Sequence, residues 1–336
     1  SMAAAEALPK LELICFGAPL VRIDGGEAPA DVLWRKHHAL LVYLALSPGR
    51  ERSRDHLMGT LWPDKPQDKA RHSLNEAVRR LRTGLGSGRL LSHGDTIGLA
   101  SEALDLDVAK FLECVAEGSE SAIEYLRGDF LEGFSVDDAE AFESWMSSER
   151  ERLHSLATSF LLEQGEKRLV FSQFTEALTV AKQALHLNPF VEPAANLAMR
   201  ALALSGDATG ALAVYHEFAA RIRKEIGEGP GKELEALYNR VRNGRWQSAA
   251  TSRTLDVPPL VGRSAISAEA FGIVEDALGG RASTLVIVSD PGMGKTRILN
   301  DCARRAAISG AVVSTARPLV SDHDARWSSL GLVVGG

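Results

Sequence analysis

Apolar residues recur with two different spacings along the first hundred residues of the chain. Two short runs, LELICFG and PLVRIDGG, have the character of β-strands, and the second ends in a Gly-Gly pair that is typical of a turn. Helical spacing follows around His37–Leu46. It returns after Ser53, a suitable N-cap, and continues to Leu61, shortly before Pro63. The pattern predicts two strands and then two helices.

A third predicted helix, from about Gln67 to Leu85, separates apolar from charged side chains. At 100° per residue its apolar residues fall on one stripe that must face a core. The stripe consists of Ala70, Leu74, Val78, Leu81 and Leu85. The opposite face carries His72, Asn75, Glu76 and Arg79, flanked by Arg71 and Arg82 on one side and by Lys69, Ser73 and Arg80 on the other.

The segment RLLSHGDTIGLA after this helix predicts a β-hairpin. Leu90–Leu91 and Thr96–Leu99 would pair on either side of a Gly94-Asp95 turn. Two strands, three helices and a closing hairpin make a winged helix of the response-regulator output type. We therefore expect residues 10–104 to form such a domain.

The third helix has the side chains that reading of DNA requires. From Lys69 to Thr83 there are five Lys and Arg residues and a single acid, Glu76. A helix in the major groove uses guanidinium and amide groups for base edges and flanking cations for phosphates. The residues predicted to contact DNA are Lys69, Arg71, His72, Asn75, Arg79, Arg80, Arg82 and, on the hairpin, His93. The alternative is a solvated basic face on which Glu76 and Arg80 form an i,i+4 pair.

Residues 105–245 have helical spacing almost throughout and contain an internal repeat. The segment Phe174–Pro189 is matched by Gly206–Ala219, which aligns Ala177 with Ala211 at an offset of 34 residues. This is the tetratricopeptide period, with small residues where paired helices approach closely. Because such units bury their faces only by stacking, we expect Trp145–Leu162 to supply a preceding helix.

The last part of the chain changes character again. A polar stretch over residues 246–259 is typical of a linker, and an α/β pattern begins after it. Within STLVIVSDPGMGKTRIL, four residues match a phosphate-binding loop between a strand and a helix: Gly292, Gly294, Lys295 and Thr296. Thr296 would also bind magnesium when nucleotide is present. Ser289 stands where the motif has its first glycine.

Charge and cysteine content narrow the function further. Residues 10–104 hold 14 Lys and Arg against 11 Asp and Glu, whereas residues 105–245 hold 15 against 24, so nucleic-acid contact belongs to the first region. The three cysteines, Cys15, Cys114 and Cys302, lie far apart and support neither a disulfide framework nor a zinc site. With no apolar run of about 18 residues and no signal-peptide pattern, we expect a cytoplasmic protein without membrane contact.

The succession of these phrases resembles one known family. LELICFGAPLVRIDG, ARHSLNEAVRRLRTGLG and LDLDVAKFLE look like the winged helix of Streptomyces-type antibiotic regulatory proteins. Residues 105–242, with ESWMSSERERL and the closing YHEFAARIRKEIGEGPGKELEALYNRV, are similar to the bacterial transcriptional activator domain that follows it. The resemblance implies sequence-specific binding near promoters, commonly as a homodimer on direct repeats, and contact with RNA polymerase.

The larger members of this family continue into an AAA-like signal-transduction NTPase, which PPLVGR and the phosphate-binding loop resemble. ATP or ADP with magnesium is therefore an expected ligand of a full-length protein, although not one that DNA binding requires. Hydrolysis needs an acid at the end of a second strand. The one apolar run after Thr296, AVVSTA, ends without an acid, so we expect the chain to be no enzyme.

The predicted fold is thus mainly α with a small β component. It comprises a winged helix-turn-helix over 10–104, TPR-like α-helical repeats over 105–245, a linker over 246–259, and the incomplete start of a P-loop α/β domain over 260–336. The preferred interpretation is a DNA-binding transcription regulator, an activator whose repeats dimerise or sense a signal. Two alternatives remain: a signal-transduction ATPase that assembles with nucleotide, and a protein-interaction scaffold built on the repeats.

Overall fold

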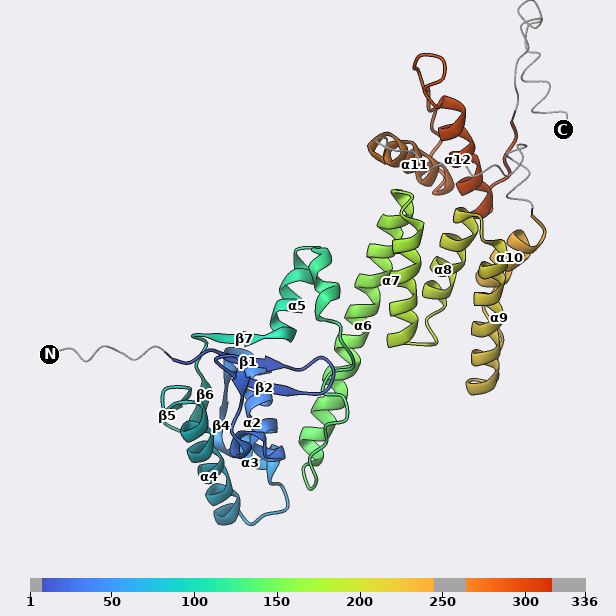
Figure 1. Ribbon diagram of the computed structural model, residues 1–336. Helices are drawn as coiled ribbons and strands as arrows, with labels where there is room; N and C mark the ends of the chain where they lie inside the picture. The colour runs from blue at the N-terminus through green and yellow to red at the C-terminus, as the bar shows by residue number, and fades with distance from the viewer. Residues whose placement is uncertain (1–7, 245–263, 316–336) are drawn as a thin grey trace, which may run out of the picture. The chain divides into compact units, whose positions relative to one another are not determined.

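The computed structural model of the chain describes residues 8–244 and 264–315 and divides into two compact units after Ala157 (Figure 1). The predicted linker over 246–259 lies outside the described residues. The first unit contains all the strands found in the described residues, and the second contains helices α7 to α12.

A four-stranded sheet opens the first unit. Strands β1 (Leu11–Ile14), β2 (Leu20–Ile23) and β3 (Gly26–Glu27) are antiparallel neighbours, and β7 (Leu104–Leu106) pairs parallel to β1. The side chains of β1 alternate between buried and half-buried, as a strand with one covered face requires. The sequence predicted β1 and β2 but not the parallel partner β7.

Three main helices follow the first three strands. Helix α2 (Arg35–Leu46), preceded by the single turn α1 (Ala30–Leu33), is buried from His37 to Ala45. Helix α3 (Arg54–Leu61) is capped as predicted, with the backbone N–H of its third residue donating to the hydroxyl of Ser53. Helix α4 (Gln67–Leu85) has the predicted bounds. Its apolar stripe is confirmed, since no member is more than 4% exposed: Ala70, Leu74, Val78, Leu81 and Leu85.

The closing hairpin is also confirmed. Strands β5 (Leu90–His93) and β6 (Thr96–Leu99) pair around a turn in which Gly94 has φ 59°, a conformation that glycine adopts at no steric cost. A short strand before α3, β4 (Glu51–Ser53), pairs with β6 and completes a three-stranded wing sheet. The three helices and this sheet form a winged helix.

One arginine lies inside this domain instead of on its surface. Arg89, between α4 and the wing, is fully buried, and its guanidinium donates to the backbone carbonyls of Pro9, Ala100 and Glu102. Burial lowers the pKa of Arg89. Because these carbonyls come from segments far apart in the sequence, Arg89 ties the start of the chain to the end of the wing.

The first unit extends beyond the predicted boundary at residue 104. Asp107, at the start of α5 (Asp107–Ala116), accepts hydrogen bonds from the backbone N–H groups of Cys15 and Phe16 at 2.8–2.9 Å. A 3₁₀ helix (Glu120–Tyr125) leads to α6 (Glu140–Val170). The start of α6 packs on the winged helix, where the ring of Trp145 lies edge-on to that of Tyr43 with 4.7 Å between the ring centroids. The first compact unit therefore includes residues 105–157, the beginning of the region predicted to form TPR-like repeats.

The second unit is a stack of helices. It begins with the later part of α6 and continues with α7 (Phe174–Leu187), α8 (Glu192–Ser205), α9 (Ala208–Glu225) and α10 (Lys232–Arg242). The aligned residues Ala177 and Ala211 are fully buried in α7 and α9. A Cβ added to Gly165 of α6 would lie 2.2 Å from a methyl of Leu197. Small residues thus permit the close helix packing that the sequence repeat predicted.

Two helices from the C-terminal region belong to the same unit. Helices α11 (Ser264–Leu278) and α12 (Lys295–Ile308) form a small core of Ala270, Phe271, Ile298 and Cys302. Arg305 of α12 is buried, with its guanidinium 3.6 Å from the ring centroid of Phe271, and donates to the carbonyl of Leu169.

The strand predicted before the phosphate-binding loop is not formed. No strand is assigned between residues 283 and 290, although Leu285 and Ile287 pack on the α11–α12 core while Val286 and Val288 are 75% and 86% exposed. The predicted strand-like run at 311–316 likewise has no strand in its described part, residues 311–315. A strand needs hydrogen-bonded neighbours, and no partner strand for either run lies in the described residues.

Candidate nucleic-acid interface

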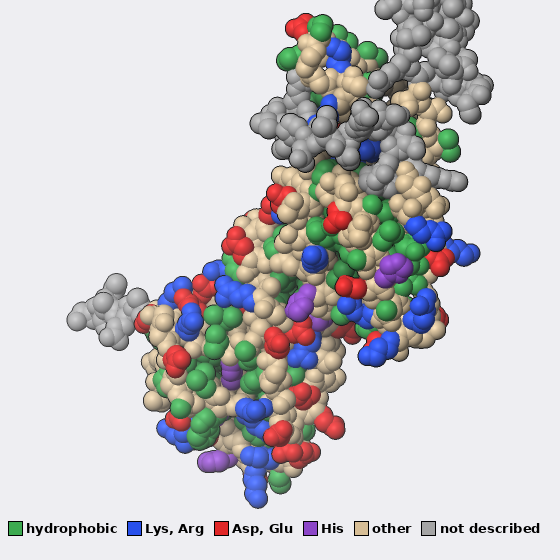
Figure 2. All heavy atoms as spheres, turned by 45° about the vertical axis from the view of Figure 1, so that its right-hand side comes forward, with side chains coloured by type: hydrophobic (Ala, Val, Ile, Leu, Met, Phe, Trp, Pro, Cys, Tyr) green, Lys and Arg blue, Asp and Glu red, His purple; other side chains and the backbone are tan. Residues whose placement is uncertain are grey.

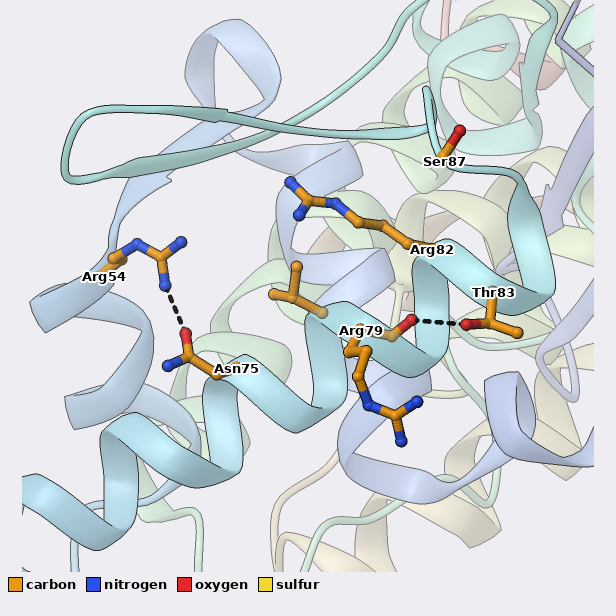
Figure 3. Close-up of a pocket in the computed structure, with 7 residues that line it drawn as sticks. Arg54, Asn75, Arg79, Arg82, Thr83 and Ser87 are labelled. Atoms are coloured by element: carbon orange, nitrogen blue, oxygen red, sulfur yellow. Dashed lines mark hydrogen bonds between the residues drawn. The ribbon is translucent and has the colours of Figure 1, made fainter.

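A surface hollow of 460 Å³ lies between α3, the outward face of α4 and the turn that leads to the wing (Figure 3). Its lining residues are Arg54, Asn75, Val78, Arg79, Arg82, Thr83 and Ser87. Three of the predicted DNA contacts therefore lie together: Asn75, Arg79 and Arg82. The hollow is shallow and strongly basic, since it has three guanidinium groups and no acidic lining residue.

Asn75 is oriented by a residue of the preceding helix. The Nη1 atom of Arg54, at the start of α3, donates to Oδ1 of Asn75 at 2.8 Å, and Figure 3 shows the two side chains pointing toward each other. Arg54 comes directly after the helix cap Ser53. Arg54 thus orients the Asn75 side chain on the outward face of α4.

Arg79 is held by the single acid of the basic segment. Its Nε and Nη2 atoms donate to the two carboxylate oxygens of Glu76 at 2.9 and 2.7 Å. Arg80 donates to the same carboxylate at 2.7 Å from its Nε atom. Hydrogen bonds from these guanidinium groups, that of Arg79 first, lower the pKa of Glu76 to about 2.

Arg80 has further partners of its own. Its Nη1 atom donates to the carboxylate of Asp31 in α1 at 3.0 Å, and its guanidinium lies 4.7 Å from the ring centroid of Trp34. The i,i+4 pair with Glu76, considered above as the alternative to DNA contact, is therefore present. The predicted contact of Arg80 with a phosphate stays a prediction, and it would have to compete with two carboxylates.

Arg82 connects the helix to the wing. Its Nε atom donates to the carbonyl of Leu90 at 2.9 Å, and its Nη2 atom donates to the hydroxyl of Ser92 at 2.8 Å. Both acceptors belong to β5. His93 follows at the exposed end of the same strand, where it pairs in register with Thr96. Arg82 therefore fixes how the wing stands relative to α4.

The remaining predicted contacts lie toward the beginning of α4 and outside the hollow. Lys69, Arg71 and His72 are exposed, and none has an ion pair with another described residue. Figure 2 shows one face of the molecule, on which Lys and Arg side chains are interspersed with Asp and Glu. On that face no single basic field identifies the binding surface, so the case for DNA contact depends on α4.

Sequence reasoning missed Arg54, Thr83 and Ser87 as lining residues. Thr83 lies one turn after Arg79, on the same side of the helix. Arg54 lies 21 residues before Asn75, so their contact depends on how α3 packs on α4. No local pattern in the sequence indicates this contact, although the N-cap Ser53 identifies the start of α3.

The second predicted site is the phosphate-binding loop. Gly292 and Gly294 have φ values of 82° and 86°, and the loop leads into α12, which begins at Lys295. The Nζ atom of Lys295 donates to the carbonyl of Asp290 at 2.9 Å and to that of Ser289. Thr296 is exposed in the first turn of α12. Positive φ angles, a helix N-terminus and a lysine at the same loop fit a bound phosphate.

Other kinds of site are not found in the described part of the chain. Within residues 8–244 and 264–315, no three His, Cys, Asp or Glu side chains lie close enough together to hold a metal ion. Cys15, Cys114 and Cys302 are free thiols. None of the described helices is long and apolar enough to cross a membrane.

Comparison with known proteins finds one family match in the predicted winged-helix region and another in the predicted activator domain. The family described as "Transcriptional regulatory protein, C terminal" matches residues 32–93, which span α2 to β5. The family described as "Bacterial transcriptional activator domain" matches residues 99–242. These matches say nothing of the phosphate-binding loop, which lies beyond them.

Two regulatory proteins align with most of the chain. The regulatory protein AfsR of Streptomyces coelicolor is 29% identical over 307 residues, and that of Streptomyces griseus is 26% identical over 293. Each alignment covers 81% of this chain, and the chain spans 30% of the length of each AfsR protein. The transcriptional regulatory protein EmbR of Mycobacterium tuberculosis is 23% identical over 254 residues, which cover 69% of this chain and 63% of EmbR.

A solved structure shares the fold. Mycobacterium tuberculosis EmbR in complex with a low-affinity phosphopeptide superposes with a TM-score of 0.55 at 21% identity, over 80% of this chain and 71% of that one. The chain thus resembles the transcriptional regulators AfsR and EmbR, with a winged helix that overlaps the match to the transcriptional regulatory family and a bacterial transcriptional activator domain after it.

Proposed function

We propose that the chain binds double-stranded promoter DNA in a sequence-specific manner and activates transcription. Helix α4 enters the major groove, and the β5–β6 wing lies along the neighbouring backbone. The observation that carries this proposal is the lining of the hollow, where Asn75 and Arg79 are held by neighbouring side chains on the outward face of α4. Guanidinium and amide groups on an exposed helix face are the groups that read base edges.

The predicted contacts divide into two kinds. Asn75 and Arg79 are assigned to base edges because they lie at the middle of the exposed face. Lys69, Arg71 and His72 extend the same helix toward its N-terminus and are assigned to phosphates, together with His93 on the wing. Arg82 is assigned to the orientation of the wing, since β5 already engages it.

The second unit is assigned a role in assembly. Stacking of α7 to α10 leaves an extended surface with no excess of positive charge, since residues 174–242 hold eight Lys and Arg against eight Asp and Glu, so we assign it to protein contacts and not to a second DNA site. We infer that this unit forms a homodimer or senses a signal, and that the DNA-bound protein contacts RNA polymerase. Pairing two winged helices would raise affinity for repeated half-sites through effective concentration, without any new contact.

Selection of bound sequences from random duplex DNA tests the proposal directly. The expected result is a defined motif, repeated in direct orientation if the protein binds as a dimer. Recovery of no motif would contradict sequence-specific binding. It would favour one of the two alternative functions, an assembling signal-transduction ATPase or an interaction scaffold.

We further propose a nucleotide site at the phosphate-binding loop. Gly292, Gly294, Lys295 and Thr296 would hold the phosphates of ATP or ADP, with Thr296 at a magnesium ion, and a bound nucleotide would act as a switch in a longer protein. The loop alone would provide few contacts for the adenine of the nucleotide. We therefore propose that the chain is not an enzyme and that its DNA binding needs no nucleotide.

We predict at most weak binding of ATP with magnesium, with a dissociation constant above about 100 μM, because an unpaired segment and two helices bury too little surface to fix the loop. Calorimetry of the wild type and of Lys295→Ala measures this directly. Micromolar binding that the substitution abolishes would contradict the prediction. The DNA affinity of Lys295→Ala should equal that of the wild type.

A further inference from the structure

Apart from Val78, every side chain that lines the hollow offers a hydrogen-bond donor. Asn75 carries both an acceptor and a donor and could read several bases. Its acceptor Oδ1 already receives the hydrogen bond from Arg54 at 2.8 Å. Because a guanidinium has donors only, Oδ1 must face Arg54, and the Nδ2 amide hydrogens point away from it.

This orientation leaves the choice of base open. A bidentate contact with adenine needs Oδ1 to accept from the N6 amino group while Nδ2 donates to N7. Oδ1 keeps a second lone pair beside the hydrogen bond from Arg54, so it can still accept from a base. The contact therefore sets the direction of the Asn75 amide without selecting a base, and the choice of base depends on Arg79.

Arg79 is oriented by an acidic neighbour. Glu76 occupies the edge of the guanidinium formed by Nε and Nη2. The second edge, formed by Nη1 and the outer hydrogen of Nη2, has no partner among the described residues. This edge has two parallel N–H donors, which suit O6 and N7 of guanine. Because Glu76 binds one edge of the Arg79 guanidinium, the other edge remains free to contact a base.

The carboxylate of Glu76 is itself held in place. Arg80 donates to it at 2.7 Å and is bound in turn to Asp31 of α1, with Trp34 beside the guanidinium. Arg80 is 28% exposed, compared with 65% for Arg79. The series Asp31, Arg80, Glu76, Arg79 therefore runs from a half-covered anchor on α1 to the exposed face of α4.

We infer that Glu76 is a positioning residue that leaves the second donor edge of Arg79 facing the DNA, so that the bound DNA presents guanine to Arg79. This inference rests on the proposed function, and it adds which base is selected and which residue enforces the choice. Exposed pairs contribute little to stability, and an acid beside phosphates weakens their binding. Glu76 is thus better explained by specificity than by affinity or folding.

The test uses the full chain, its selected DNA site and copies of that site in which each guanine in turn is replaced by 7-deazaguanine, which lacks only the N7 acceptor. Fluorescence anisotropy at fixed salt gives the affinity for each duplex. For the wild type, at least one replacement should weaken binding by roughly 5- to 150-fold. In Glu76→Ala the same replacement should weaken binding less than about threefold, while affinity for unrelated DNA stays equal or rises.

Asp68→Ala is the matched control, because it removes one acid from the same helix, about two turns from Glu76, and contacts no arginine of the hollow. It should retain the full sensitivity to 7-deazaguanine. Glu76→Gln, which keeps the size of the side chain but has one acceptor, should lose most of that sensitivity.

Three outcomes have distinct meanings. A Glu76→Ala protein that keeps the sensitivity would overturn the positioning role. A wild type that binds a defined motif without sensitivity at any guanine would overturn the inference and leave the proposed function standing. A wild type with no sequence preference would overturn the proposed function, and the inference with it.

Discussion

Replacing Asn75 and Arg79 together by alanine is expected to remove about 2–6 kcal/mol from the free energy of binding to the selected site, since each base contact contributes about 1–3 kcal/mol. Affinity for unrelated DNA should fall far less, because only one charge is lost. The two side chains lie on one face of α4 and line the same hollow. Gel-shift titration on specific and unrelated duplexes, at several salt concentrations, measures both quantities.

Arg71→Ala provides the comparison on the same helix. Arg71 is exposed and lies outside the hollow, so its loss should weaken binding to all sequences alike. The slope of log K against log salt concentration should fall by about one, which corresponds to one counterion fewer released on binding. If the double variant behaved like Arg71→Ala, with equal losses on both duplexes, α4 would not be the element that reads the bases.

Replacing the buried Arg89 by alanine is expected to lower the free energy of unfolding of the first unit by about 3–4 kcal/mol. The substitution leaves the carbonyls of Pro9, Ala100 and Glu102 without their donor in a buried site. Each orphaned acceptor costs about 1 kcal/mol or more, and the cavity adds to the loss. Denaturant unfolding followed by tryptophan fluorescence measures the change.

Arg22→Ala is the control for the loss of an arginine from the same unit, because Arg22 is exposed on β2. It should change the free energy of unfolding by no more than about 0.5 kcal/mol. A change below about 1 kcal/mol for Arg89→Ala would mean that water or a neighbouring side chain satisfies the three carbonyls.

The parts of the fold that depend on local patterns could be predicted from the sequence. Helix α4 has the predicted bounds because its apolar period persists over five turns, so packing and local propensity agree. The wing was recognisable from a turn pair, Gly94-Asp95, between two short apolar runs. In the second unit, the 34-residue offset between Ala177 and Ala211 was visible because paired helices need small residues at their contacts.

The parts that depend on distant partners could not be predicted. Strand β7 has three residues, and its pairing with β1 joins segments about 90 residues apart, so no local period indicates it. Arg54 meets Asn75 only after α3 packs on α4. No local pattern distinguishes Arg89 from the other arginines of the first region, although the structure buries it. The strand expected before Gly292 is not formed, although its local pattern is typical of a strand, because the described residues contain no partner strand with which it could form hydrogen bonds.

Methylation interference on the selected site tests the central claim, that α4 reads the major groove, most directly. Dimethyl sulfate modifies guanine at N7 in the major groove and adenine at N3 in the minor groove. The account predicts that N7 methylation within the motif prevents binding by the wild type, and that Arg79→Ala becomes insensitive at one of those guanines. Interference confined to adenine N3, or the same N7 pattern in Arg79→Ala, would contradict it.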